Sequence, residues 1–180
     1  QHDAEVTFEE KLKAEDVEEN MIEFEMNNWK NHQSKRYYTE NSYDFKMESI
    51  GIYENEKIVE IACNIIKKRI EIIKEKIEKG VLKIETEKIA LNHSYDITLE
   101  NEDYTVGKVL EYILHYKYYL DLDKLNYIGF LKPHPHDSDS LIRLAFKNET
   151  DFNNEMLYSI LLDTCNISIK LFDVIKENFK

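Results

Sequence analysis

The spacing of apolar residues changes near residue 55, and this change constrains the fold more than any other feature of the sequence. Between residues 43 and 49, apolar and charged side chains alternate, which is the pattern of a half-buried strand. From residue 56 to residue 79, apolar residues recur every three or four positions, which predicts a long amphipathic helix. Gly51 is expected to end the strand and Gly80 to end the helix.

The apolar stripe of the predicted 56–79 helix is unusually wide. Its main line consists of Val59, Ala62, Ile66, Ile70, Ile73 and Ile77. A second line beside it consists of Ile58, Ile61, Ile65 and Ile72. The opposite face carries the charged residues Lys67, Lys68, Glu71, Glu75 and Glu78. A stripe this wide indicates that the helix packs against more than one neighbour.

Residues 81–180 predict a second series of strands and helices. The expected elements are, in order, a hairpin of short strands at 82–84 and 97–99, a helix at 105–120, strands at 125–131 and 140–147, and a helix at 151–180. Thr105 is expected to cap the first of these helices, and Thr150 or Asp151 the second.

This order of elements predicts an α+β fold with antiparallel sheets packed against long amphipathic helices. We expect three segments. Residues 1–41 form an acidic helical arm or connector, in which Thr7 and Glu10 have the spacing of a capping box. Residues 42–80 and residues 81–180 form two units, each ending in a helix too apolar to stand alone. These two helices are expected to pack on each other or on a partner.

The formal net charge of −12 over 180 residues limits the classes of partner. A strongly acidic surface repels phosphate backbones, so no direct contact with nucleic acid is expected. No run of residues is long and apolar enough to span a bilayer, so no membrane partner is expected either. The chain begins at Gln1 with a polar, acidic stretch, and we expect the natural protein to continue upstream.

The two cysteines, Cys63 and Cys165, each fall within an apolar helical pattern. Buried free thiols fit this pattern better than a disulfide does, and they indicate an intracellular, reducing compartment. A thiol in a helix core is a poor nucleophile. The sequence also contains neither a glycine-rich phosphate loop nor the Gly-x-Ser-x-Gly motif of a serine hydrolase, so no cofactor is expected.

One cluster, Pro133-His134-Pro135-His136-Asp137, allows two interpretations. The two histidines can bind one metal ion and Asp137 can add an oxygen ligand, which would suit a small metal-dependent hydrolase. Alternatively, the two prolines fix the backbone of a rigid turn and the histidines form local contacts. The turn is the simpler interpretation, because a metal site needs further ligands that the sequence does not place nearby.

The segment from Glu102 to Leu110 reads Glu-Asp-Tyr-Thr-Val-Gly-Lys-Val-Leu. It resembles the motif Glu-Asp-His-Thr-Leu-Gly-Asn-Leu-Leu of the eleventh-subunit family of eukaryotic RNA polymerase II and its archaeal counterpart. The family continues to Gly-Tyr-x-x-Pro-His-Pro, and this chain has Gly-Phe-Leu-Lys-Pro-His-Pro from Gly129 to Pro135. The resemblance covers residues 81–180, with both motifs in the same order and spacing.

Residues 43–51, followed by the isoleucine-rich helix, are similar to the end of the third-subunit family, the other alpha-like partner in the same polymerases. Cellular polymerases keep these two subunits as separate chains. A single chain that joins them resembles the fused subunit of large nucleocytoplasmic DNA viruses. A viral source would imply the host cytoplasm and the virion as locations.

The resemblance implies an assembly role without catalysis, cofactor or metal in this chain, although the complex itself would be a nucleotidyltransferase. The two alpha-like domains would pair within the chain, and the second-largest subunit and other polymerase subunits would dock on the platform they form. The structural motif residues implied are Thr105, Gly107, Pro133, His134 and Pro135. The pairing residues implied on the helices are Leu110, Ile113, Leu161, Phe172, Ile66, Ile70 and Ile73.

Overall fold

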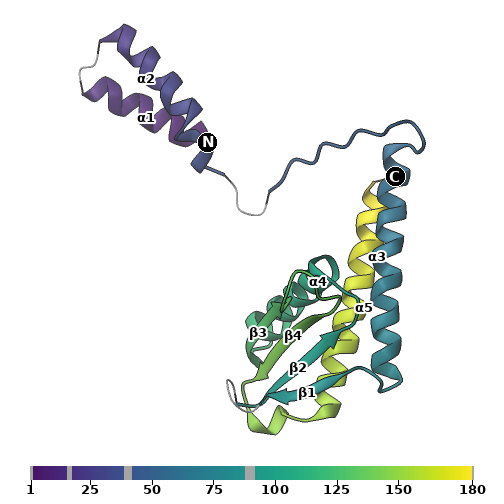
Figure 1. The fold of residues 1–180 in the computed structure, drawn as a ribbon. Coiled ribbons are helices and arrows are strands. Elements are labelled where there is room, and N and C mark those ends of the chain that lie inside the picture. Colours follow the sequence, from purple (N-terminus) through teal and green to yellow (C-terminus); the bar gives the residue numbers. More distant parts are fainter. Residues whose placement is uncertain (1, 16–17, 39–41, 88–91, 180) are drawn as a thin grey trace. The chain divides into compact units, whose positions relative to one another are not determined.

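The computed structural model of the protein describes residues 2–15, 18–38, 42–87 and 92–179, and it divides into two compact units (Figure 1). The first unit, residues 1–47, contains α1 (His2–Ala14), α2 (Glu19–Asn31) and the short 3-10 helix η1 (Ser34–Arg36). The second unit, residues 48–180, contains α3 (Asn55–Glu78), β1 (Ile84–Glu87), β2 (Ser94–Leu99), α4 (Tyr104–Leu114), η2 (His115–Asp121), β3 (Leu125–Leu131), β4 (Ser140–Phe146), η3 (Glu149–Asp151) and α5 (Asn154–Asn178).

A small apolar core holds α1 against α2 in the first unit. The ring of Phe8 stacks on Trp29 with centroids 5.6 Å apart, and Trp29 and Leu12 are buried. The helical character expected here is confirmed, but the capping box expected at Thr7 is wrong. Thr7 lies inside α1, and its hydroxyl donates to a main-chain carbonyl one turn earlier at 2.8 Å, because the helix already begins at His2.

The α+β fold is confirmed by the second unit, where the described strands form one four-stranded antiparallel sheet in the order β1-β2-β4-β3. In the register of β2 and β4, Ile97 lies opposite Ile142 and Tyr95 lies opposite Leu144. These apolar residues are buried and face the helices. On the other face of the sheet, Arg143 makes two hydrogen bonds of 2.6 Å to the carboxylate of Asp96. The alternation along both strands therefore separates a core face from a polar face.

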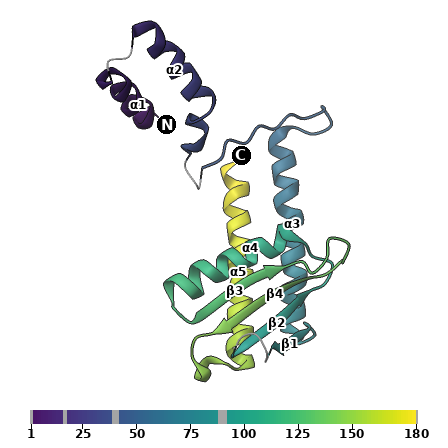
Figure 2. The same ribbon diagram turned by 60° about the vertical axis from the view of Figure 1, so that its left-hand side comes forward.

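One core joins the three helices of the second unit to this sheet. Its buried residues on α3 are Cys63, Ile70, Ile73 and Ile77, those on α4 are Val106, Leu110 and Leu114, and those on α5 are Leu157, Ile160, Leu161, Cys165 and Phe172. The helices α3 and α5 lie side by side and run well past the sheet (Figures 1 and 2). The helix predicted at 56–79 thus shares a single body with the elements predicted at 81–180.

The strand predicted at 43–49 is wrong. Residues 42–50 have no regular secondary structure, and the side chains of Tyr43 and Phe45 are 75% and 91% exposed. The alternation of apolar and charged residues is compatible with a strand that has one buried face. The sheet described here has β1 and β3 as its edge strands, so residues 43–49 do not belong to it. Gly51 does mark a turn, with φ of +92°, and Gly80 ends α3 with φ of +66°, which is the left-handed conformation that glycine tolerates.

The two short strands predicted at 82–84 and 97–99 are present and pair with each other, but they run over 84–87 and 94–99. The remaining predicted elements match the structure closely, apart from two helix details. The side chain of Asn153 caps α5 by accepting the N–H of Met156 at 2.8 Å, whereas Thr150 and Asp151 belong to the short helix η3. The helix predicted at 105–120 continues beyond α4 as the π-helical segment η2. In the described parts of the chain, no helix has the length and apolar character needed to cross a membrane.

The π-helical segment directs two side chains of η2 onto α5. Lys117 Nζ and the Tyr118 hydroxyl both lie 2.6 Å from the carboxylate of Asp163. Burial and the hydrogen bond to Asp163 raise the pKa of Tyr118. Burial raises the pKa of Asp163, but the hydrogen bonds from Lys117 and Tyr118 lower it by more, so the net shift is downward. These hydrogen bonds attach η2 to α5.

Alkaline pH is expected to destabilise the protein through Cys165. Burial raises the pKa of this thiol to about 12, so the folded state holds its proton longer than the unfolded state does, where the pKa is about 8.5. The stabilising contribution is complete below pH ~8.5 and falls by up to ~1.4 kcal/mol per pH unit as the pH rises towards 12. Urea unfolding from pH 8 to pH 11 measures this slope. The Cys165→Ala variant should show a shallower slope, and an unchanged slope would contradict the assignment.

Candidate assembly site

The resemblance points to the segment that leaves β2 and enters α4, and we call residues 100–107 the motif turn. Asn101 adopts φ of +57°, and its N–H donates to the Asp139 carboxylate at 2.9 Å. Asp103 is the N-cap of α4 and accepts the N–H of Thr105 at 3.0 Å. The prediction that Thr105 itself is the cap is therefore wrong, and the helix begins one residue earlier. The hydrogen bond from the Thr105 N–H lowers the pKa of Asp103.

Glu102 of the motif turn binds α3, a contact that sequence reasoning missed. Arg69 donates to its carboxylate from Nε at 3.0 Å and from a terminal guanidinium nitrogen at 2.6 Å. Arg69 also lies 3.3 Å from Asp103. The hydrogen bond with Glu102 raises the pKa of Arg69. No sequence signal predicted this pair, because 33 residues separate the partners and each occurs in a charge-rich stretch.

Gly107 lies directly beneath the ring of Phe130 in β3. A Cβ atom at this position would overlap one edge of the ring, with the ring Cζ 2.8 Å away and two further ring atoms nearer still. Phe130 is fixed in turn, because its N–H donates to the Glu111 carboxylate at 2.9 Å and Tyr104 packs against its edge. The motif glycine therefore allows α4 to approach the sheet closely.

The predicted pairing residues lie mostly inside the core of the second unit. Leu110, Ile113, Ile70, Ile73, Leu161 and Phe172 are buried, and Ile66 is half-buried. They bring α3, α4 and α5 together within one chain. The structure thus shows direct packing between the helix at 55–78 and the helix at 154–178, as expected for helices too apolar to stand alone.

The two sides of the α3–α5 pair differ in chemistry. On one side, which we call the polar flank, Lys67 pairs with Asp173. Lys176 lies 3.3 Å from the Glu60 carboxylate and donates to the Asn64 side chain at 3.3 Å. Ion pairs and hydrogen bonds between the two helices therefore line this flank.

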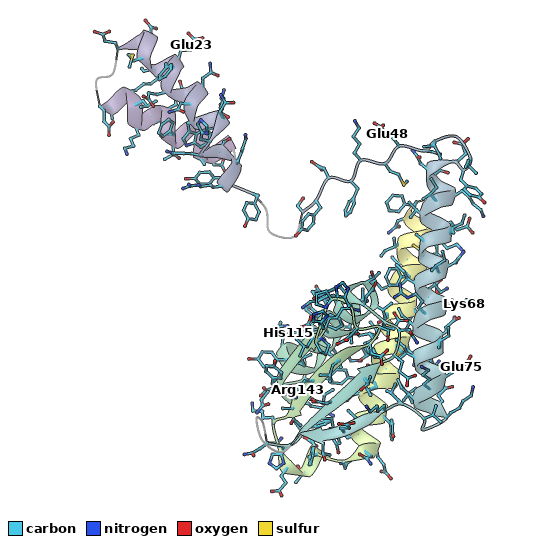
Figure 3. All side chains as sticks on the ribbon, viewed as in Figure 1. Glu23, Glu48, Lys68, Glu75, His115 and Arg143 are labelled. Atoms are coloured by element: carbon cyan, nitrogen blue, oxygen red, sulfur yellow. The ribbon has the colours of Figure 1, made fainter. Side chains whose placement is uncertain are left out.

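The opposite side, which we call the apolar flank, was not among the predicted pairing residues. It consists of Ile58 and Ile65 on α3 and Ile167, Leu171 and Val174 on α5. Ile65 is 56% exposed and Val174 is 54% exposed. Ile58 and Ile65 belong to the second isoleucine line of the predicted 56–79 helix. That line was the sequence feature from which this flank could have been predicted. Lys68 and Glu75 project away from α5 (Figure 3).

The Pro133-His134-Pro135 turn is exposed on the surface. The N–H of His136 donates to Nδ1 of His134 at 3.2 Å, and the N–H of Asp137 donates to the His134 carbonyl at 3.0 Å. These are the local contacts of a turn. Within the described ranges, no three His, Cys, Asp or Glu side chains gather closely enough to hold a metal ion. The local hydrogen bonds of the cluster are those that the turn interpretation predicts.

Comparison with known protein families and with curated protein sequences gives no match to this chain.

The pair between Arg69 and Glu102 is expected to stabilise the protein more than a neighbouring pair that joins the same elements. The side chain of Glu102 is largely buried, so Glu102→Ala leaves Arg69 with only the longer contact to Asp103. We expect a loss of about 1–3 kcal/mol in the free energy of unfolding. Lys76→Ala is the matched control, because its 2.6 Å pair with Glu100 is exposed and should contribute about 0–1 kcal/mol. Equal losses in urea unfolding would show that the motif turn is not anchored through Glu102.

Proposed function

We propose that this chain is a non-catalytic assembly subunit of a multisubunit DNA-directed RNA polymerase. The observation that carries the proposal is the geometry of the motif turn. Three of its polymerase-like residues have structural roles, since Glu102 binds α3, Asp103 caps α4, and Gly107 allows α4 to approach β3. None of these roles is catalytic, which fits a protein that holds other subunits together.

The proposal includes two alpha-like parts in one polypeptide. Residues 42–80 would correspond to the end of a third-subunit-like domain and residues 81–180 to an eleventh-subunit-like domain, as in the fused subunit of large nucleocytoplasmic DNA viruses. The packing of α3 along α5 supports this proposal, because it joins the last helix of each part. The second-largest polymerase subunit is the proposed partner, and the host cytoplasm and the virion are the proposed locations.

Affinity purification from the native source tests the proposed function. The tagged full-length protein is expected to recover the two largest polymerase subunits in near-equal amounts, as identified by mass spectrometry. The Gly107→Trp variant should lose them, because it forces α4 away from Phe130. Glu71→Ala, at an exposed position on α3, is the control and should retain them. Recovery of the tagged chain without any polymerase subunit would contradict the proposal.

A further inference from the structure

Strand β3 is one edge of the sheet, and its composition suits it to pairing with a further strand. Among the described strands it pairs with β4 alone, and β1 forms the other edge of the sheet (Figure 2). The seven residues of β3, Leu125–Leu131, include no charged side chain and no proline. An edge strand of this kind presents backbone groups that pair readily with a strand of another molecule.

The sequence of the other edge strand discourages such pairing. Strand β1 has only four residues, and two of them are Glu85 and Glu87. Lys83 lies directly before it. Short length and charged side chains both protect an edge strand from pairing. Because β3 has neither property, any protection of this edge comes from a neighbouring element.

Helix α4 supplies a carboxylate to the free edge of β3. The Phe130 N–H donates to the Glu111 carboxylate at 2.9 Å, so it points away from β4 and towards α4. In an antiparallel ladder, the N–H groups of successive residues point alternately to the two sides of the strand. The Phe130 N–H is therefore one of the groups that an incoming strand would use, and Glu111 already accepts its hydrogen bond.

Two neighbouring residues of α4 hold Glu111 in this position. Lys108 Nζ lies 2.5 Å from the Glu111 carboxylate and 5.7 Å from the centroid of the Phe130 ring. Gly107 allows α4 to approach β3 closely, which brings the backbone of the strand within reach of the glutamate. The Glu111 side chain is only 20% exposed. A carboxylate that gives up most of its hydration for one backbone N–H and one ammonium group makes a specific contact.

We propose that Glu111 protects the β3 edge, because its carboxylate occupies the Phe130 N–H and prevents β3 from pairing with the same strand of a second copy. Two β3 strands would pair antiparallel about a two-fold axis, since such a contact uses the same edge on both molecules. Neither strand brings a charged side chain to the contact, so the strands do not repel each other. This inference goes beyond the proposed function, because it concerns the chain alone and requires no polymerase subunit.

Two variants that separate reach from charge test the proposal. Glu111→Asp keeps the charge, but its side chain is one methylene shorter and is expected to fall short of the Phe130 N–H. Glu111→Gln loses the charge but keeps an oxygen acceptor at the same reach. Light scattering of the purified full chain in about 0.5 M salt, which screens charges beyond a few ångströms, gives the molecular mass. Glu111→Asp should raise the mass at least to that of a dimer, and Glu111→Gln should keep the mass of the parent.

Two further variants show whether any association occurs through β3. Lys108→Ala is the matched control on α4 and should keep the parent mass, because it removes the ion pair but leaves the acceptor. Tyr127→Lys, at an exposed position of β3, places like charges on the paired edges and should return Glu111→Asp to the parent mass. Association of Glu111→Gln but not Glu111→Asp would overturn the proposal, since charge alone would then keep the copies apart. Association that persists with Tyr127→Lys would overturn it as well.

Hydrogen exchange supplies a readout that does not depend on association. In dilute solution, where the mass equals that of the parent, the Phe130 amide should exchange about tenfold faster or more in Glu111→Asp, because its acceptor is lost. The amide of Leu144, in the central strand β4, should keep its parent rate and reports any general loss of stability. An unchanged rate at Phe130, or equal acceleration at both amides, would overturn the proposal.

Discussion

Replacing Gly107 by alanine is expected to lower the free energy of unfolding by about 1–3 kcal/mol, because the new methyl group would overlap the ring of Phe130. The sign of this change in stability distinguishes a steric clash with Phe130 from the usual effect of alanine in a helix. Glycine to alanine in a helix interior ordinarily stabilises a protein by up to about 1 kcal/mol, since alanine restricts the unfolded chain and favours helix. Urea unfolding monitored by circular dichroism measures the change.

The control for this prediction removes the ring. In a Phe130→Leu background, Gly107→Ala should lose most of its cost, because leucine places fewer atoms over α4. A double-mutant cycle of the two positions is expected to give a coupling energy of about 1 kcal/mol or more. If Gly107→Ala stabilises the protein that retains Phe130, the close approach of α4 to β3 is not a constraint on this fold.

Replacing Ile70 by alanine is expected to cost about 2–5 kcal/mol, which makes it one of the most damaging conservative changes in α3. Ile70 is completely buried in the core that α3 shares with the sheet and α5. The lost methyl and methylene groups would leave a cavity that three packed elements surround, so the site has little freedom to collapse.

Ile65→Ala is the matched control for Ile70→Ala, with the same residue change on the same helix. Because Ile65 is exposed in the isolated chain, its truncation should change the free energy of unfolding by about 0.5 kcal/mol or less. Chemical unfolding of both variants under identical conditions gives the comparison. Similar losses at the two positions would mean that α3 does not share a core with the rest of the second unit.

The sequence predicted the elements whose patterns are decided locally. The strands expected at 125–131 and 140–147 match β3 and β4 to within a residue, because turn-forming residues bound their alternating runs. The long helix expected at 56–79 begins and ends within a residue of α3. In each case, the spacing of apolar residues changes at the helix or strand boundary, so the local sequence is sufficient to predict the element.

The features that were missed depend on contacts between distant residues. The strand pattern at 43–49 shows which side chains would share a face, but it cannot show whether a neighbouring strand exists. The caps were misplaced because Asp103 and Asn153 competed with nearby threonines that have a similar preference for the position. The pair between Arg69 and Glu102 joins two segments that only the tertiary fold brings together.

In the candidate site, too, the local features were predicted from the sequence and the contacts between distant residues were not. The motif turn was found from its residues, but the reason for its glycine appears only when Phe130 of β3 is seen above it. The width of the isoleucine stripe predicted more than one neighbour for α3. Which line of isoleucines would be covered depends on how α5 and the sheet are placed, and the sequence of α3 does not encode that choice by itself.

The π-helical turn of η2 also has a consequence for sequence length. Such a turn holds one residue more than an α-helical turn, so it behaves as a single-residue insertion absorbed within a helix. Deleting one residue between His115 and Lys117 would restore regular winding, and the later side chains would keep their places because the wide turn has already absorbed that residue. Tyr118 would then still reach Asp163, and the attachment of this segment to α5 would be kept. A relative of this protein that is one residue shorter here should therefore retain an acceptor at the position of Asp163.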